Sequence, residues 1–358
     1  MMPSVTIGVT EDVVKSDYIS TASTSTAANG LEALSLSTIY YQAFVIAIAI
    51  VGTLANGSVC ALLAQLELRK RGAINILILN QLSLDLFSCL WLLVTYSVQF
   101  ETLYLTGTWG YLVCQFITSQ LFIWIGLQGS VIGMVMITLE RYAKLVHLAS
   151  YKKYFRQWMI YAGVAISWVS GFLVYFPASW TTTNIVQGQC LSDYFWPSAA
   201  ASQVYVTIYV LISFILPFCV FVYCYGHILV FIKRKAKVFG GNLAASDSLL
   251  ASSLRIQMNI IRTMLIIVLF FALSWTPNQV FIILFNFGLL YNNNNNLQTV
   301  AWNAFVFMTF LNVCVNPFIY ASQYNAIKKH IIGLARAIQA KMSRGSQQNP
   351  VTNIELRV

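Results

Sequence analysis

The hydrophobic positions of this chain gather into seven long runs that are separated by short polar segments. Each run is long enough to cross the hydrocarbon core of a bilayer, which is roughly 30 Å thick and requires about 20 apolar residues in a helix. Strands of a membrane barrel are far shorter, so we expect an all-α membrane protein, a bundle of seven transmembrane helices. The runs cover residues 40–64, 74–99, 111–139, 158–180, 204–232, 264–290 and 297–320.

Composition and charge predict how this bundle sits in the membrane. The chain is 58% hydrophobic and 9% charged, a balance that excludes a soluble domain of this length. Its net charge of +10 does not indicate a nucleic-acid partner, because the basic residues fall in alternate loops and in the tail, on one side of the bilayer. Lys15 alone falls on the other side. The positive-inside rule therefore predicts an N-terminus outside the cell.

The two ends of the chain differ from the spans in composition. Residues 1–36 are polar and rich in Ser and Thr, which predicts a disordered extracellular N-terminus. Residues 37–322 then form the transmembrane domain. Within residues 323–341, apolar residues recur at helical spacing between basic ones, a pattern typical of a short amphipathic eighth helix on the inner membrane surface. Residues 342–358 are expected to form a flexible cytoplasmic tail.

The cysteines divide into two groups by their position. Five of the seven lie within the spans, where single cysteines act as small hydrophobic residues. Cys114, at the outer start of the third span, and Cys190, in the second outer loop, face an oxidising compartment. Two available cysteines allow one pairing, so we expect a Cys114–Cys190 disulfide. It would hold the long outer loop across the mouth of the bundle.

Polar residues and prolines interrupt the apolar spans at a few places. Asp85 is the only carboxylate deep within a span, where a charge requires partners or protonation. It is either a polar contact between helices or a cation or proton site, and the behaviour of ionisable residues in membranes favours the second. Pro217, Pro277 and Pro317 each interrupt another long apolar helix. A proline frees a carbonyl and kinks a helix, which indicates hinges.

Several short motifs follow one another along the chain, in order from the first span to the seventh. They are Gly52 with Asn56, Asn80-Gln81-Leu82-Ser83-Leu84-Asp85, Trp109 before Cys114, Glu140-Arg141-Tyr142, Trp168, Pro217 with Tyr225, Phe271-x-x-x-Trp275-x-Pro277, and Asn316-Pro317-Phe318-Ile319-Tyr320. Single motifs of this kind are unspecific. The ordered set, which covers nearly everything from residue 40 to residue 340, resembles the rhodopsin-like (class A) G-protein-coupled receptors.

The resemblance implies a receptor of the plasma membrane that is not an enzyme. Such a receptor binds an extracellular ligand, changes conformation and activates a heterotrimeric G protein, with arrestin as a further partner. Arg141 matches the residue that is exposed to the G protein, and Tyr225 and Tyr320 match the pair that swings in to support it. The residues implied in coupling and switching are Glu140, Arg141, Tyr142, Tyr225, Asn316, Pro317 and Tyr320.

The resemblance also implies two sets of residues inside the membrane. Phe271 and Trp275 match the switch that lies beneath the ligand. An allosteric sodium ion, the one ion or cofactor that the resemblance implies, is held in the inactive state. Its matching positions are Asp85, Ser130, Asn312 and Asn316.

The chain departs from the family pattern in two places. Many members have an acid that clamps the arginine twenty residues before Pro277, where this chain has Gln257. We therefore expect noticeable basal activity, although Glu140 can still hold Arg141 locally. Cys114 also lies two residues farther from Arg141 than usual, which predicts an extra bulge in the outer third helix and leaves positions near Ile123 uncertain by a residue or two.

The same comparison narrows the class of ligand. The seventh span contains no lysine for a Schiff base, with Phe310 at the matching position, so an opsin is excluded. An amine receptor requires an aspartate near Ile123, and no acid lies there. The expected pocket is neutral, amide-rich and aromatic, and amides suit a peptide backbone because they both donate and accept hydrogen bonds. Its candidate residues, with the switch beneath them, are Tyr96, Gln99, Gln120, Ile123, Trp124, Gln128, Tyr209, Phe271, Trp275, Asn278, Gln279 and Asn303.

We thus expect a receptor of the peptide type, with a lipid or another neutral small molecule as the alternative ligand. The segment before Cys190 contains strand-forming residues and favours a hairpin lid. Several of the amides could instead join helices by hydrogen bonds. A non-signalling seven-helix protein, such as a decoy receptor or a transporter, is a different possibility. A decoy would be expected to lose Arg141 or the Asn316–Tyr320 motif, and a transporter would be expected to have more charged residues in its core than Asp85.

Overall fold

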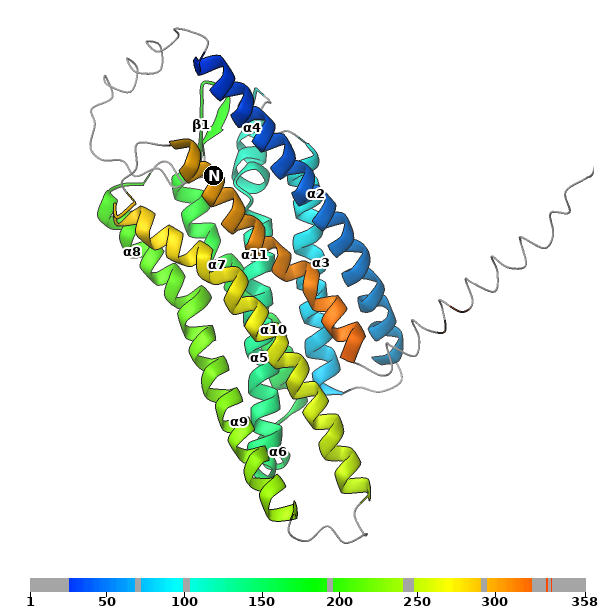
Figure 1. Cartoon of the computed structure of the whole chain (residues 1–358). Helices are drawn as coiled ribbons and strands as arrows, with labels where there is room; N and C mark the ends of the chain where they lie inside the picture. The colour runs from blue at the N-terminus through cyan, green and yellow to red at the C-terminus, as the bar shows by residue number, and fades with distance from the viewer. Residues whose placement is uncertain are drawn as a thin grey trace, which may run out of the picture.

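The computed structural model describes residues 26–67, 72–98, 104–191, 196–240, 248–290 and 295–323, together with Gly333 and Arg336. The described residues form a bundle of long helices (Figure 1). In chain order the elements are α2 (Thr26–Glu67), α3 (Ala73–Ser97), α4 (Gly107–Val113), η2 (Cys114–Thr118), α5 (Leu121–Val146), α6 (Leu148–Tyr154), α7 (Gln157–Thr182), β1 (Asn184–Val186), β2 (Gln189–Leu191), α8 (Ala199–Val210), η3 (Leu211–Ile215), α9 (Leu216–Gly240), α10 (Ser248–Asn286) and α11 (Asn295–Gln323).

The predicted all-α bundle of seven spans is confirmed. Seven described segments are apolar and long enough to cross a membrane, from Thr38–Gln65 to Gln298–Tyr320. The fifth of them joins α8, η3 and α9 into one continuous span, Ala199–Arg234. Among the described residues, the β-structure is a single hairpin in which β1 pairs antiparallel with β2.

The bundle has two distinct ends (Figure 1). The β-hairpin, α4 and the start of α8 lie at one end, here called the hairpin end. The short helix α6 and the lower parts of α9 and α10 lie at the opposite end, here called the α6 end. The two ends provide separate surfaces on either side of the apolar bundle.

Helix α5 is the centre of the packing. It lies against α3, α7 and α9, and its inward residues are almost all buried. Small residues permit the close approach of neighbouring helices, because a Cβ at Gly129 would lie 2.9 Å from the carbonyl oxygen of Ser167 in α7 and 2.7 Å from the side chain of Leu84 in α3. The backbones of α5 and α7 therefore meet at this position without a side chain between them.

The predicted prolines lie within helices, as expected. Pro277 is inside α10 and Pro317 is inside α11, and α7 contains a further one, Pro177. Pro217 is the second residue of α9, which begins where the π-helical turn η3 ends. Proline cannot donate a backbone hydrogen bond, and such a wider turn is one way in which a helix accommodates the loss.

Several of the expected segments fall outside the described residues. They include the start of the N-terminal segment, the tail and the amphipathic eighth helix apart from Gly333 and Arg336. Helix α2 begins at Thr26, so the expected domain boundary at residue 37 lies inside it. The apolar part of that helix begins at Thr38.

Candidate functional site

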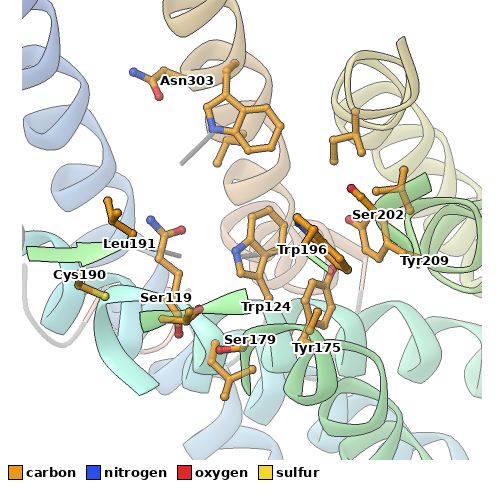
Figure 2. A pocket seen from close by; sticks show the side chains of 18 of the residues that line it. Ser119, Trp124, Tyr175, Ser179, Cys190, Leu191, Trp196, Ser202, Tyr209 and Asn303 are labelled. Carbon is orange, nitrogen blue, oxygen red and sulfur yellow. The ribbon is translucent and has the colours of Figure 1, made fainter. Parts of the chain in front are cut away.

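A cavity of about 510 Å³ opens within the hairpin end of the bundle. Residues from α2, α3, α5, α7, β2, α8, α10 and α11 line it, so every long helix except α9 contributes to its wall. Figure 2 shows side chains from facing elements pointing into this space, with Trp124, Tyr175 and Tyr209 below Asn303. None of the lining residues that the structure describes carries a charge.

Aromatic rings and hydrogen-bonding groups alternate over the cavity wall. Trp124 stacks on Tyr175, with ring centroids 5.8 Å apart, and Tyr175 meets Tyr209 edge to face at 5.6 Å. On the other side, the hydroxyl groups of Tyr41 and Tyr96 lie 3.3 Å apart. The lining residues are Thr38, Tyr41, Gln42, Tyr96, Ser119, Gln120, Leu121, Trp124, Tyr175, Ala178, Ser179, Thr183, Gln189, Cys190, Leu191, Trp196, Ser202, Tyr205, Val206, Tyr209, Ile282, Asn286, Thr299, Trp302, Asn303 and Val306.

The third span is broken where it borders the cavity. The π-helical turn η2 ends at Thr118, and Gln120 then adopts a left-handed backbone conformation with φ 60° and ψ 20°. This is the extra bulge that the Cys114–Arg141 spacing predicted. A left-handed conformation is unfavourable for a residue with a Cβ. The break directs the Gln120 side chain to the Tyr96 hydroxyl, to which its Nε2 donates at 3.2 Å.

The β-hairpin forms part of the cavity wall through β2. The predicted Cys114–Cys190 disulfide is present and ties β2 to the start of η2. The hairpin turn places Gln187 and Gly188 at φ 52° and 79°, and glycine adopts such values without a steric penalty. The Gly188 carbonyl accepts a hydrogen bond from the backbone N–H of Leu105 at 2.8 Å, which holds the tip against the preceding loop.

The predicted pocket residues lie in two layers. Five of them, Tyr96, Gln120, Trp124, Tyr209 and Asn303, line the cavity. Gln99 lies outside the described residues. The remaining ones are buried and do not line the cavity; they are Ile123, Gln128, Phe271, Trp275, Asn278 and Gln279.

The lower layer supports the cavity from beneath. Gln279 Nε2 donates to the Tyr209 hydroxyl at 3.1 Å, which fixes a lining side chain through a residue that does not line the cavity. Gln128 and Asn278 are fully buried, and within the described structure neither of their amide groups has a hydrogen-bond partner. Buried amides of this kind normally bond to water or to a ligand. Trp275 packs on Phe271, with ring centroids 5.4 Å apart, and both rings are fully buried.

Asp85 lies deep in the core with no exposed surface. Its Oδ2 atom accepts a hydrogen bond from Asn316 Nδ2 at 2.8 Å, which joins α3 to α11. The side chains of Ser130 and Gln81 lie beside the carboxylate, and its Oδ1 atom has no hydrogen-bond partner within the described structure. Asn312 is fully buried, and neither of its amide atoms has a partner within the described structure.

The Glu140-Arg141-Tyr142 motif lies at the α6 end. Arg141 Nε is 2.9 Å from Glu140 Oε2, and both side chains are almost fully buried. The Tyr151 hydroxyl of α6 donates to the other carboxylate oxygen at 3.0 Å. Burial raises the pKa of the Tyr151 hydroxyl well above its usual range, and the neighbouring Glu140 carboxylate raises it further, so Tyr151 remains a donor. Glu140 therefore holds Arg141 locally, as the sequence indicated.

Both tyrosines of the predicted switch, Tyr225 and Tyr320, are buried in the bundle. Tyr225 is almost fully buried and its hydroxyl lies 3.2 Å from Thr138 Oγ1, one turn before Arg141. Tyr320, at the end of the seventh span, is fully buried. Tyr142 contacts His147, with the hydroxyl 3.3 Å from the ring Nε2. The side chain of Gln257 lies outside the described residues.

Sequence reasoning missed a group of cavity residues. Trp196, Ser202 and Asn286 come from the segment after the hairpin and from the upper ends of α8 and α10. Ser202 Oγ donates to Asn286 Oδ1 at 2.7 Å, which closes the cavity wall between these two helices. No motif marks these positions, and their polar character at the outer ends of apolar runs was the only available signal.

Comparisons with known proteins agree with this architecture. The chain is 27% identical over 296 residues to the high-affinity lysophosphatidic acid receptor of Xenopus laevis. The aligned region covers 77% of this chain and 75% of the relative. It is 24% identical over 337 residues to the human neuropeptide Y receptor type 4-2, with coverage of 86% and 82%. It is 25% identical over 284 residues to the rat galanin receptor type 1, with coverage of 75% and 74%.

The sequence profile of one family spans all but the ends of the bundle. The profile described as "7 transmembrane receptor (rhodopsin family)" matches residues 55–320, which run from the middle of α2 to Tyr320 in α11. The matched region contains the disulfide, the buried aspartate, the Glu140–Arg141 pair and all of the cavity wall except the residues from α2. The chain belongs to the rhodopsin family of seven-transmembrane receptors.

Proposed function

We propose that this receptor binds an uncharged segment of an extracellular peptide in the cavity and activates heterotrimeric G proteins at its α6 end. As a member of the rhodopsin family, the chain is a plasma-membrane receptor and not an enzyme. The class of ligand is inferred from one observation, the uncharged and amide-rich wall of the cavity.

The lack of charge restricts the ligand. A buried ionic group costs several kcal/mol unless an opposite charge or a set of hydrogen bonds compensates it. Among the described lining residues there is no cation for a phosphate or carboxylate, and no anion for an amine. One relative is named as a receptor for lysophosphatidic acid, which has a phosphate group. A phosphate would find no ionic partner among the lining residues of this chain.

The hydrogen-bonding groups of the wall favour a peptide over a neutral lipid. Gln120, Gln189, Asn286 and Asn303 each present an amide to the cavity, and an amide both donates and accepts. A peptide backbone offers the same pair of functions at each residue. A neutral lipid offers no such pair of functions, and each lining amide that it buried without a partner would cost about 1–3 kcal/mol.

The size of the cavity limits how much of a peptide it can hold. Pockets for drug-sized molecules usually measure about 300–1,000 Å³. A cavity of about 510 Å³ therefore accommodates a short segment of a peptide and not a folded chain. Its aromatic wall, including Trp124, Trp196 and Trp302, suits aromatic or aliphatic side chains on that segment. Two relatives are named as receptors for neuropeptide Y and galanin.

The orientation of the bundle completes the proposal. Basic residues gather at the α6 end, where α6 contains Lys152 and Lys153 and the last turn of α5 contains Lys144. The positive-inside rule then supports a cytoplasmic α6 end. The Cys114–Cys190 disulfide would face the oxidising exterior in this orientation.

Coupling would proceed through Arg141. The side chain is held by Glu140 in this structure, and Arg141 Nη2 makes no hydrogen bond within the described residues. A ligand that binds the released state more tightly than the held state would shift the population towards it. The freed guanidinium group would then be available to a G-protein α subunit.

G-protein dissociation in living cells tests the proposal. Wild type and Arg141→Ala would be compared across a panel of α subunits, first without ligand and then with a library of short neutral peptides. Activation by a peptide that depends on Arg141, and that Trp124→Ala weakens at equal surface expression, would support it. Activation by neutral lipids alone, or dissociation that does not depend on Arg141, would contradict it.

A further inference from the structure

The side chain of Gln81 occupies an unusual position beside the buried aspartate. Gln81 is fully buried in α3, one turn before Asp85, and its Nε2 donates a hydrogen bond to Ser130 Oγ in α5. The same side chain lies beside the Asp85 carboxylate. The amide nitrogen of Gln81 therefore faces Ser130, next to Asp85.

A glycine makes room for this arrangement. A Cβ atom at position 133 would lie 2.5 Å from Gln81 Oε1 and 3.7 Å from Asn80 Nδ2. The carbonyl end of Gln81 thus points at the bare backbone of Gly133, on the side where the Asn80 amide group also lies. Rotating the Gln81 amide by half a turn would bring its N–H₂ group towards that of Asn80, which is electrostatically unfavourable. This placement supports the orientation with the nitrogen on Ser130.

The donor chemistry around Asp85 disagrees with a sodium site. A hard cation requires converging oxygen atoms. Asn316 instead presents its nitrogen to the aspartate, with Nδ2 at 2.8 Å from Oδ2, and the Ser130 oxygen already accepts a hydrogen bond from Gln81 Nε2. Neither the amide nitrogen nor the amide oxygen of Asn312 has a partner within the described structure. A water molecule can accept from the nitrogen and donate to the oxygen, whereas a cation can bind only the oxygen.

We propose that the amide group of Gln81 takes the place of a sodium ion in this receptor, so that the buried Asp85 is stabilised by side-chain donors and responds weakly or not at all to sodium. The partial positive charge of the N–H₂ group compensates the carboxylate without an ion. The proposal concerns α3, α5 and α11 only, and it does not depend on which ligand the receptor binds.

Thermal unfolding of the purified full-length receptor in detergent micelles tests this directly. Sodium chloride would replace choline chloride at constant ionic strength, with potassium chloride as a second reference. The wild-type midpoint is expected to stay constant. In Gln81→Met, which keeps the length of the side chain and removes its donors, sodium should raise the midpoint by about 5 °C at saturation. The additional change Asp85→Asn should abolish that rise.

Two further variants separate the proposed role from a general effect of packing. Gln128→Met replaces another fully buried glutamine of the bundle and should leave the midpoint insensitive to sodium. Gly133→Ala places a methyl group where the Gln81 carbonyl lies and should produce sodium dependence through displacement of that side chain, even if Gln81→Met does not fold. A sodium-dependent rise in the wild type as large as that in Gln81→Met would overturn the proposal. So would insensitivity of both Gln81→Met and Gly133→Ala.

Discussion

Glu140 Oε2 lies 2.9 Å from the Nε atom of Arg141, the next residue in the chain, and only 2% and 6% of these two side chains are exposed. Consecutive residues of a helix point in different directions, so this contact requires Glu140 to reach along the helix surface. Tyr151 of α6 holds the other carboxylate oxygen at 3.0 Å. The pair is therefore clamped from a second helix.

Loss of this clamp should raise ligand-free signalling. Glu140→Gln keeps the shape of the side chain and removes its charge, so the held state of Arg141 loses an ion pair. We expect basal G-protein dissociation to rise roughly tenfold. Tyr151→Phe removes one hydrogen bond from a partly exposed group and should raise it about threefold. Both rises should disappear when Arg141→Ala is added. Basal signals equal to wild type at equal surface expression would contradict the prediction.

The close packing of three helices provides a stability test. A Cβ at Gly52 of α2 would lie 2.5 Å from Cys89 Sγ in α3 and 2.7 Å from Cys314 Sγ in α11. Gly52→Ala should lower the free energy of unfolding by about 1–3 kcal/mol, because the two thiols cannot both move away in a fully packed core. Gly57→Ala is the matched control, since its nearest neighbour would be Leu86 Cδ1 at 3.9 Å. Thermal unfolding in micelles should separate them, and equal midpoints would refute the argument.

The disulfide should contribute strongly to the stability of the hairpin end. Cys114 and Cys190 are 76 residues apart, and closing a loop of that length lowers the entropy of the unfolded chain, which corresponds to about 4 kcal/mol. The double variant Cys114→Ser, Cys190→Ser should therefore show a lower unfolding midpoint and reduced surface expression. Replacement of Cys219, which is exposed and unpaired among the described cysteines, serves as the control and should change neither.

Much of this fold follows from sequence pattern alone. Apolar runs determine the spans, because only a long apolar helix is stable across the hydrocarbon core of a bilayer. The bulge in the third span followed from counting residues between Cys114 and Arg141, and the structure places a π-helical turn and the left-handed Gln120 there. Positions fixed by spacing along one helix were thus predictable.

The division of the pocket into two layers could not be predicted in the same way. Gln128 and Asn278 have the polar character of lining residues, yet both are fully buried and lie outside the cavity wall. The depth at which a side chain sits depends on the rotation of its helix and on what covers it. Trp196 lies in the connection before α8, where no periodicity restricts its position. Such residues require the tertiary structure.

The uncharged cavity leads to a prediction about peptide ends. If the end of a peptide enters the cavity, its terminal charge must be absent, because no described lining residue compensates it. For any peptide that activates the receptor through its C-terminus, the amidated form should be more than about tenfold more potent than the free acid. Asn303→Lys places a cation on the wall and should reduce or reverse this preference in the dissociation assay.

A charge added away from the cavity provides the control for that variant. Leu289 lies just after α10 and is 68% exposed, so Leu289→Lys should leave the preference for the amidated form unchanged. Equal potency of amide and acid in the wild-type receptor would show that the terminal group stays in solvent. An equal effect of both lysine variants would indicate attraction by the whole surface and not by the cavity wall.

The strained backbone of Gln120 allows its conformation to be separated from its side chain. Gln120→Gly removes the steric penalty of the left-handed conformation, about 1 kcal/mol, and also removes the hydrogen bond to Tyr96. Gln120→Ala removes the same hydrogen bond and keeps the penalty. The glycine variant should therefore unfold at a higher temperature than the alanine variant by a few degrees. If alanine were the more stable, as it is in a regular helix, the third span would have to continue through this position without a break.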